Sequence, residues 1–125
     1  MSKLDDAKVI LENLQTRLPD INDLAIARTN GLIIASLSRM ASTDNKMERL
    51  MGGMASALFS ISKRAAEELL KGEFISLTTE ISTGNIFLIY TGKVILMVVT
   101  KKEPNLGLIS LELEEAAKKL NVVFA

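Results

Sequence analysis

The order of the apolar segments constrains the fold of this chain more than any other feature of its sequence. Eight segments carry either the helical period of apolar residues or the short apolar runs that are typical of strands. In chain order, with helices first, fourth and last, they span 4–18, 24–29, 32–37, 44–70, 73–81, 86–90, 94–100 and 108–120. Strands that follow one another through short turns pair antiparallel. The sequence therefore predicts an α+β fold of the order α-β-β-α-β-β-β-α, in one domain over residues 1–125.

Local signals support several of these boundaries. Ser2 is a favourable N-cap for the first helix, and Pro19 ends that helix because the residue before a proline is pushed out of the helical region. Asn30-Gly31 predicts a type I′ hairpin turn, in which both central residues need a positive φ. Gly72 lies where a glycine commonly closes a helix in the left-handed conformation, so we expect it to end the long helix.

The long helix carries two separate apolar stripes. The first has large side chains at three- and four-residue steps, and we expect it to be the core face against the sheet. Its residues are Met47, Leu50, Met51, Met54, Leu58, Ile61, Ala65 and Leu69. The second stripe is mostly small, which favours close approach of two helix backbones. Its residues are Gly52, Ala55, Ser56, Phe59, Ser62 and Ala66. We therefore expect the second stripe to pack against a second copy of the chain.

Composition excludes several classes of chemistry. The chain has no Cys and no His, which removes disulfides, thiolate metal sites and the commonest general base. Fifteen basic and fifteen acidic side chains give a formal net charge of zero, so a strongly basic nucleic-acid binder is not expected. The clustered carboxylates, Glu67-Glu68 and Glu112, Glu114 and Glu115, lie on helix faces of mixed charge. We expect a binding module, with no catalytic residue, no cofactor and no metal.

The sequence also carries no targeting or membrane signal. The N-terminus becomes acidic at Asp5 and Asp6, unlike a secretory signal peptide. The longest apolar run covers the six residues 94–99, whereas a membrane-spanning helix needs about 20. We therefore expect a cytoplasmic protein that does not insert into a membrane.

Several strings, taken in order and at their spacing, resemble the roadblock family. This family includes dynein roadblock light chains and MglB-type regulators of Ras-like GTPases. The strings are Ala27-Arg-Thr-Asn-Gly-Leu-Ile-Ile-Ala-Ser36, Met54-Ala-Ser-Ala-Leu58, Ser62-Lys-Arg-Ala-Ala-Glu-Glu-Leu69, Asn105-Leu-Gly-Leu108 and the helical run from Leu113 to Leu120. The resemblance covers about residues 4 to 120.

The resemblance implies a specific architecture and a homodimer. It implies a five-stranded antiparallel sheet of order 2-1-5-4-3, with the long helix on one face and the other two helices on the opposite face. The third strand lies at an edge, where two copies pair while their long helices pack antiparallel. The residues expected at the dimer interface are Gly52, Ala55, Ser56, Phe59, Ser62, Ala66, Phe74, Ser76, Thr78 and Glu80.

The resemblance also implies a function. Roadblock dimers present their paired long helices to small Ras-like GTPases, so we expect this chain to bind such a GTPase through the start of its long helix and the preceding loop. These segments mix charged side chains with methionine, which adapts to irregular partner surfaces. The residues expected to bind the GTPase are Arg39, Met40, Asp44, Met47, Glu48, Arg49 and Met51.

Two other functions remain open at this stage. The chain is alternatively a structural light-chain or scaffold subunit that joins larger proteins without affecting a nucleotide cycle. A small-ligand sensor is the third hypothesis, and it requires a cavity with convergent polar groups.

Overall fold

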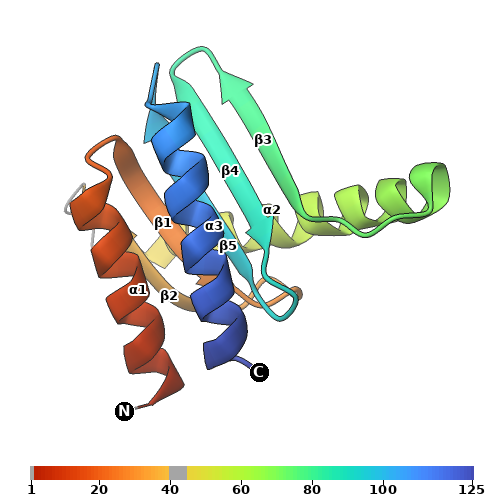
Figure 1. The fold of residues 1–125 in the computed structure, drawn as a ribbon, viewed down its shortest axis with the longest axis horizontal. Helices are drawn as coiled ribbons and strands as arrows, with labels where there is room; N and C mark the ends of the chain where they lie inside the picture. The colour runs from red at the N-terminus through yellow and green to blue at the C-terminus, as the bar shows by residue number, and fades with distance from the viewer. Residues whose placement is uncertain (1, 40–44) are drawn as a thin grey trace.

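The computed structural model, which describes residues 2–39 and 45–125, contains one five-stranded antiparallel sheet. Its strands lie in the order β2-β1-β5-β4-β3 (Figure 1). Their bounds are β1 Ile21–Ala27, β2 Ile33–Ser38, β3 Ser76–Ile81, β4 Gly84–Tyr90 and β5 Ile95–Lys101. Every pair of neighbours is antiparallel, as predicted. The α+β class and the strand order 2-1-5-4-3 are therefore confirmed.

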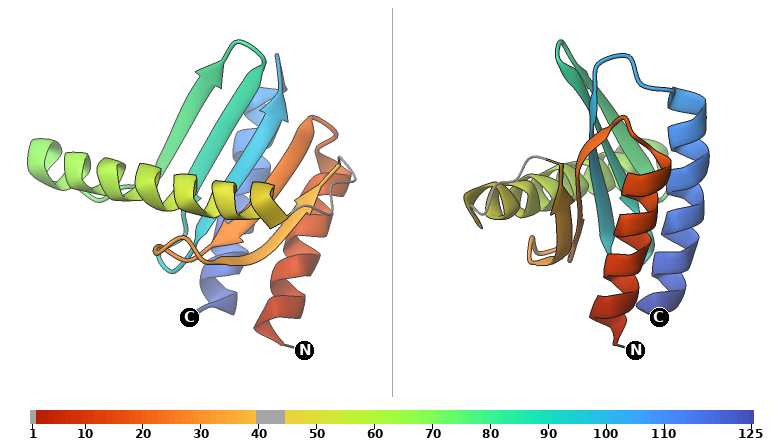
Figure 2. Two further views of the ribbon diagram at one scale, coloured as in Figure 1. Left: turned by 180° about the vertical axis from the view of Figure 1, so that it is seen from behind. Right: turned by 90° about the vertical axis from the view of Figure 1, so that its left-hand side faces the viewer.

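Helices cover both faces of the sheet. α1 (Lys3–Arg17) and α3 (Leu106–Val123) lie side by side on one face, and α2 (Asn45–Ala65) crosses the opposite face (Figures 1 and 2). Ser2 caps α1 as predicted, because its hydroxyl accepts a hydrogen bond from the Asp5 N–H at 3.1 Å. The Asn105 side chain caps α3 in the same way through the Leu108 N–H.

Two apolar layers hold the α1–α3 pair, the sheet and α2 together. The larger layer lies between the sheet and the α1–α3 pair, and it includes Leu11, Ile26 and Leu113, each no more than 1% exposed. The smaller layer lies between the sheet and α2, and it includes Met51 and Phe59. The smaller layer determines which face of α2 stays exposed.

Two of the predicted backbone details are wrong. Of Asn30 and Gly31, only Gly31 has a positive φ, at 94°, so the β1–β2 turn is not type I′. The Asn30 side chain instead accepts a hydrogen bond from the Leu32 N–H at 3.1 Å. At the end of the long helix, α2 continues into one π-helical turn, η1 (Ala66–Leu70), and Lys71 rather than Gly72 takes the left-handed conformation, with φ 57°. Lys71 follows the π-helical turn directly and is its C-cap.

Asp20 connects the end of α1 to the β5–α3 loop. Its carboxylate accepts a hydrogen bond from the Asn105 N–H at 3.1 Å and pairs with the Lys101 ammonium at 3.1 Å. The Asn105 N–H, followed by Lys101, lowers the pKa of Asp20 below its ordinary value of 3.8. Both partners favour the ionised carboxylate, so the contact depends on the charge of Asp20.

Candidate protein-interaction site

The small-residue stripe of α2 faces the chain's own sheet. Gly52 is buried, and Ala55 and Phe59 are only 1% and 6% exposed. The Ser56 hydroxyl donates a hydrogen bond to the Thr29 carbonyl at 2.7 Å. The predicted use of these four residues between two helices is therefore wrong. Small side chains do permit a close approach here, but the backbone that approaches belongs to the β1–β2 turn of the same chain.

The large-residue stripe of α2 is mostly exposed, opposite to the prediction. Only Met51 is buried, and Leu58 is half-buried in the smaller apolar layer. The exposed fractions are 52% for Met47, 47% for Leu50, 48% for Met54, 69% for Ile61 and 78% for Leu69. We call Leu50, Met54 and Ile61 the outer row of α2. Both stripes are apolar, so periodicity alone does not distinguish the face that the sheet buries.

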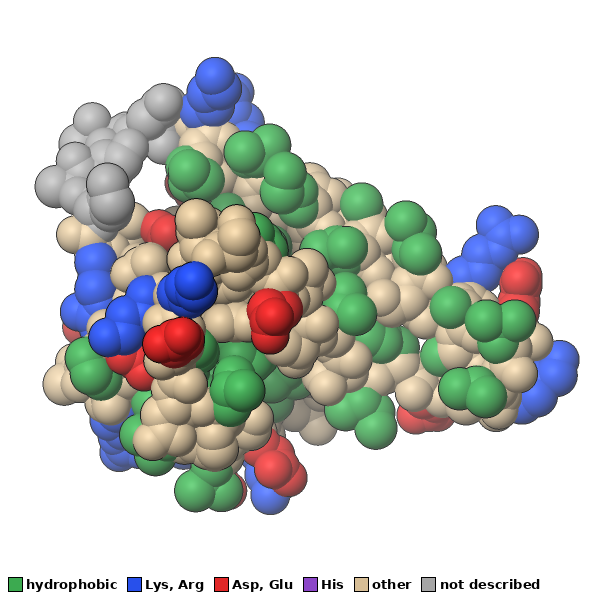
Figure 3. Space-filling view, turned by 90° about the horizontal axis from the view of Figure 1, so that it is seen from above, with side chains coloured by type: hydrophobic (Ala, Val, Ile, Leu, Met, Phe, Trp, Pro, Cys, Tyr) green, Lys and Arg blue, Asp and Glu red, His purple; other side chains and the backbone are tan. Residues whose placement is uncertain are grey.

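The C-terminal part of α2 projects past the sheet beyond β3 (Figure 2, left). Seen from above, hydrophobic side chains follow this projecting arm (Figure 3). Leu70 at its tip and Ile75 just after it are 83% and 73% exposed. Exposed apolar side chains gathered on one arm are typical of a protein-interaction surface.

The edge of β3 continues this surface. β3 pairs only with β4, and the Tyr90 N–H donates to the Ile75 carbonyl at 3.0 Å. Because hydrogen-bonded pairs alternate along an antiparallel ladder, Ser76, Thr78 and Glu80 point their backbone N–H and C=O groups outward. All three residues are exposed. This edge is therefore open to a further strand.

The other predicted dimer-interface residues are partly covered by the chain itself. Ser62 and Ala66 are half-buried. Phe74 is also half-buried, because its ring packs edge-on against Phe59 with centroids 6.0 Å apart. Phe74 is therefore an intramolecular packing residue rather than an exposed edge residue.

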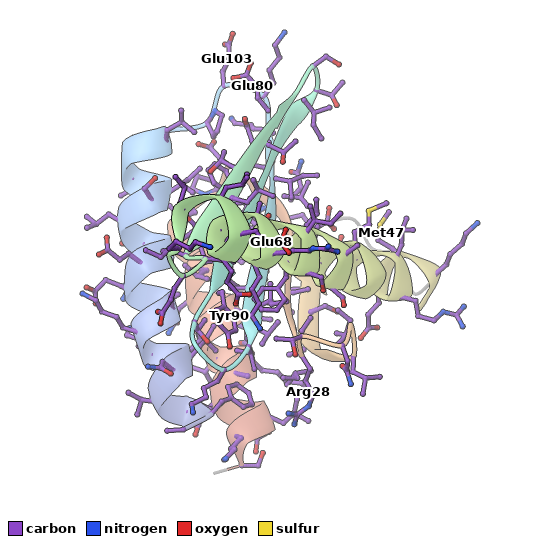
Figure 4. All side chains as sticks on the ribbon, turned by 90° about the vertical axis from the view of Figure 1, so that its right-hand side faces the viewer. Arg28, Met47, Glu68, Glu80, Tyr90 and Glu103 are labelled. Atoms are coloured by element: carbon purple, nitrogen blue, oxygen red, sulfur yellow. The ribbon has the colours of Figure 1, made fainter. Side chains whose placement is uncertain are left out.

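The predicted GTPase-binding residues are only partly available. Met47 and Arg49 are exposed at the start of α2, and Glu48 is half-buried. Met51 is 7% exposed and packs in the smaller apolar layer, so its prediction as contact surface is wrong. Met40 and Asp44 lie outside the described residues. Figure 4 labels Met47 in the first turn of α2 and Glu68 in η1, which follows the other end of the helix.

Arg39 has an internal role that the sequence did not reveal. Its guanidinium donates hydrogen bonds to the carbonyls of Gln15, Leu18 and Ile21. These carbonyls lie at the end of α1 and the start of β1, where a cation is favourable at the helix C-terminus. These hydrogen bonds give the guanidinium a structural role, whereas the residue itself is exposed, so its contact with a GTPase stays a prediction.

A pocket of about 500 Å³ beside α2 was also missed. Its apolar lining comes from Phe59, Phe74, Ile75 and Tyr90, and Lys63, Glu67 and Glu73 lie around them. Tyr90 lies beneath the C-terminal half of α2, on the same side as Arg28 (Figure 4). The only signal of this pocket in the sequence is that the chain has so few aromatic residues. The helical pattern does not indicate that Phe59, Phe74 and Tyr90 come together.

Two classes of site find no support among residues 2–39 and 45–125. No three acidic side chains come together there in a way that could hold a metal ion. No helix in these ranges is long and apolar enough to cross a lipid bilayer.

The fold and its exposed surface can be compared with known proteins. A family model described as the Roadblock/LC7 domain matches residues 8–101. The protein MJ1340 of Methanocaldococcus jannaschii is 33% identical over 117 residues, which cover 94% of this chain and 97% of that protein. The chain therefore belongs to the Roadblock/LC7 domain family.

Solved structures agree with this fold. MglB of Myxococcus xanthus superimposes with a TM-score of 0.86 at 18% identity, over 99% of this chain and 91% of that one. A structure described as MglB with tetrameric arrangement gives a TM-score of 0.87 at 14% identity, with coverage of 99% and 91%. At these identities the likeness concerns the fold.

Proposed function

We propose that this protein is a homodimeric interaction module that binds a Ras-like small GTPase through its paired α2 helices. The observation that carries the proposal is an exposed apolar row on α2 beside the open edge of β3. Membership of the Roadblock/LC7 family supports it, since the roadblock resemblance implies GTPase binding.

The dimer in this proposal uses two surfaces at once. The outward backbone groups of Ser76, Thr78 and Glu80 pair with the same strand of a second copy, so that neither edge is left unpaired. The outer row of α2 then packs on the neighbouring copy's α2 and on apolar sheet residues such as Leu77 and Ile86, which are half-buried in the single chain. Each side chain of the row that becomes buried contributes about 1 kcal/mol, because roughly half of its surface is still exposed.

The GTPase in this proposal binds the N-terminal half of α2. Met47 and Arg49 are exposed there and Glu48 is half-buried. Met47 can adapt to an irregular partner surface and form a small apolar centre of the contact. Glu48 and Arg49 then form a polar rim around it. In the same proposal the chain acts in the cytoplasm as one domain, without a cofactor, a metal or catalysis of its own.

The test uses purified protein and each Ras-like GTPase of the source organism, loaded with GDP or a non-hydrolysable GTP analogue. Binding is expected to one of these GTPases. The double variant Glu48→Lys/Arg49→Glu is expected to slow its association while the dimer stays intact, since rim charges act mainly on the encounter rate. The control is Glu114→Lys/Lys118→Glu, a matched charge reversal of exposed residues on α3.

Unchanged association of the α2 variant would place the GTPase site elsewhere. If no Ras-like GTPase binds, the structural light-chain or scaffold function is favoured instead. If one binds, its hydrolysis rate with and without the dimer distinguishes a regulator from a scaffold.

A further inference from the structure

Three of the five aromatic residues of this chain meet at one place. The rings of Phe59 and Tyr90 lie with centroids 4.7 Å apart, and those of Phe59 and Phe74 lie 6.0 Å apart. Phe59 is buried, whereas Phe74 and Tyr90 are half-buried and retain accessible surface. The cluster is therefore open to solvent on one side, with Phe59 at its base and Phe74 and Tyr90 at its accessible sides.

The aromatic pocket and the outer row lie on different sides of α2. Lys63 on the pocket rim is nine residues from Met54 of the outer row, which at 100° per residue places the two on opposite sides of α2. The remaining wall comes from Glu73, Phe74 and Ile75 just before β3 and from Tyr90 at the end of β4. No residue of the outer row lines the pocket, although its wall adjoins the edge strand β3.

The charges on the rim favour a cation. Glu67 and Glu73 supply two carboxylates, and Lys63 supplies one ammonium. The Lys63 ammonium lies 4.0 Å from Glu67. Within residues 2–39 and 45–125, Glu73 makes no ion pair and no Lys or Arg stacks on the three rings. The pocket therefore combines aromatic rings with the Glu73 carboxylate, while its one lining ammonium, on Lys63, pairs with Glu67.

We propose that this pocket binds an arginine side chain of a partner protein. A guanidinium is planar and weakly hydrated, so it stacks on an aromatic face while its N–H groups donate to a carboxylate. Phe74 and Tyr90 supply the faces and Glu73 supplies the carboxylate. The inference does not rest on the proposed GTPase or dimer, because the lining residues of the pocket all come from one chain.

The test titrates the full chain with Nα-acetyl-arginine amide at low-millimolar concentration and observes aromatic ring signals by NMR. With only five aromatic residues, every ring can be followed. The signals of Phe59, Phe74 and Tyr90 are expected to shift, whereas Phe87 and Phe124 serve as internal controls. Nα-acetyl-leucine amide is expected to cause no comparable shift.

Two variants test the roles of charge and ring. Glu73→Gln and Phe74→Leu are each expected to weaken binding of the arginine amide by roughly twofold to fivefold. The matched control is Glu68→Gln, which removes a charge near the pocket but outside its lining, where Glu68 pairs with Arg64 at 3.1 Å. Backbone amide spectra establish that each variant is folded.

Three outcomes would overturn the proposal. Equal shifts with the leucine amide would make the pocket merely apolar. No shift of the three rings, or shifts confined to Phe87 and Phe124, would remove the site. If Glu68→Gln and Glu73→Gln weaken binding of the arginine amide equally, the binding depends on net charge and not on a specific contact with Glu73. None of these results bears on GTPase binding or dimerisation, so the two proposals fail separately.

Discussion

A Cβ atom on Gly52 would lie 2.2 Å from the carbonyl oxygen of Gly31. The β1–β2 turn and α2 therefore touch through their backbones, without side chains between them. Gly31 itself has φ 94°, a conformation that other residues rarely adopt. This contact fixes where α2 crosses the sheet, and hence which of its faces stays exposed.

The first prediction concerns this contact. Gly52→Ala is expected to destabilise the fold by about 1–3 kcal/mol, because the new methyl group meets a backbone atom that cannot turn away. Gly53→Ala is the matched control, since nothing lies within 4 Å of a Cβ there. The control is expected to stabilise α2 by about 0.5–1 kcal/mol through helix propensity. Urea unfolding of both variants gives the comparison, and equal effects would contradict the packing described.

The second prediction tests the outer row of α2. Ile61→Glu is expected to raise the dissociation constant of the proposed dimer roughly tenfold or more, because an unpaired charge would be buried in the interface. Ser60→Glu places the same charge one residue earlier on an exposed position and is expected to leave the dimer intact. Light scattering over a dilution series measures both. Equal masses for both variants at every concentration would exclude the row from the interface.

The third prediction tests the edge of β3. Because the chain has no Cys, a single introduced thiol is an unambiguous probe. Thr78→Cys is expected to give a covalent dimer with a short bismaleimide, since its strand edge would lie against that of the second copy. Ser36→Cys, on the opposite edge strand β2, is the control. Cross-linking that is no faster at position 78 than at 36 would rule out pairing through β3.

The fourth prediction follows from the lowered pKa of Asp20. A carboxyl group that ionises more readily in the folded state stabilises that state at pH values above its unfolded pKa, and this contribution is lost as the pH falls through the folded pKa. Asp20→Asn is therefore expected to be less stable than the parent at neutral pH. The difference is expected to decline once the pH falls below the unfolded pKa of about 4 and to disappear below the folded pKa. Unfolding midpoints at a series of pH values measure the difference.

Lys101→Met separates the two causes of that shift. It is expected to reduce the pH-dependent difference without abolishing it, because the Asn105 N–H, the larger cause, remains. A difference between parent and Asp20→Asn that stays constant with pH would contradict the charge dependence.

The sequence predicts the parts of the fold that depend on local chemistry. Ser2 caps α1 because a hydroxyl three residues before an exposed N–H needs no tertiary context. The alternation of short apolar runs with turns predicts antiparallel strands, and the family resemblance supplies their order. These features were available from neighbouring residues and from strings of the chain itself.

The predictions that failed depend on contacts between distant segments. The two stripes of α2 are both apolar, and only the approach of Gly52 to Gly31 decides between them. Gly31 lies in the β1–β2 turn, and the type I′ prediction for this turn is also wrong. The hydrogen bonds of Arg39 could not be predicted from the sequence, because its carbonyl partners are 18 to 24 residues away.

The reversal of the two α2 faces separates folding from association in this chain. One face of α2 packs on the chain's own sheet through Gly52, Ala55 and Phe59. The opposite face exposes Leu50, Met54 and Ile61 to solvent. Substitutions in the second group leave the first group's contacts in place. If the outer row is the dimer surface that we propose, two copies of such a domain that arise by gene duplication can therefore diverge along this row while each retains the same fold.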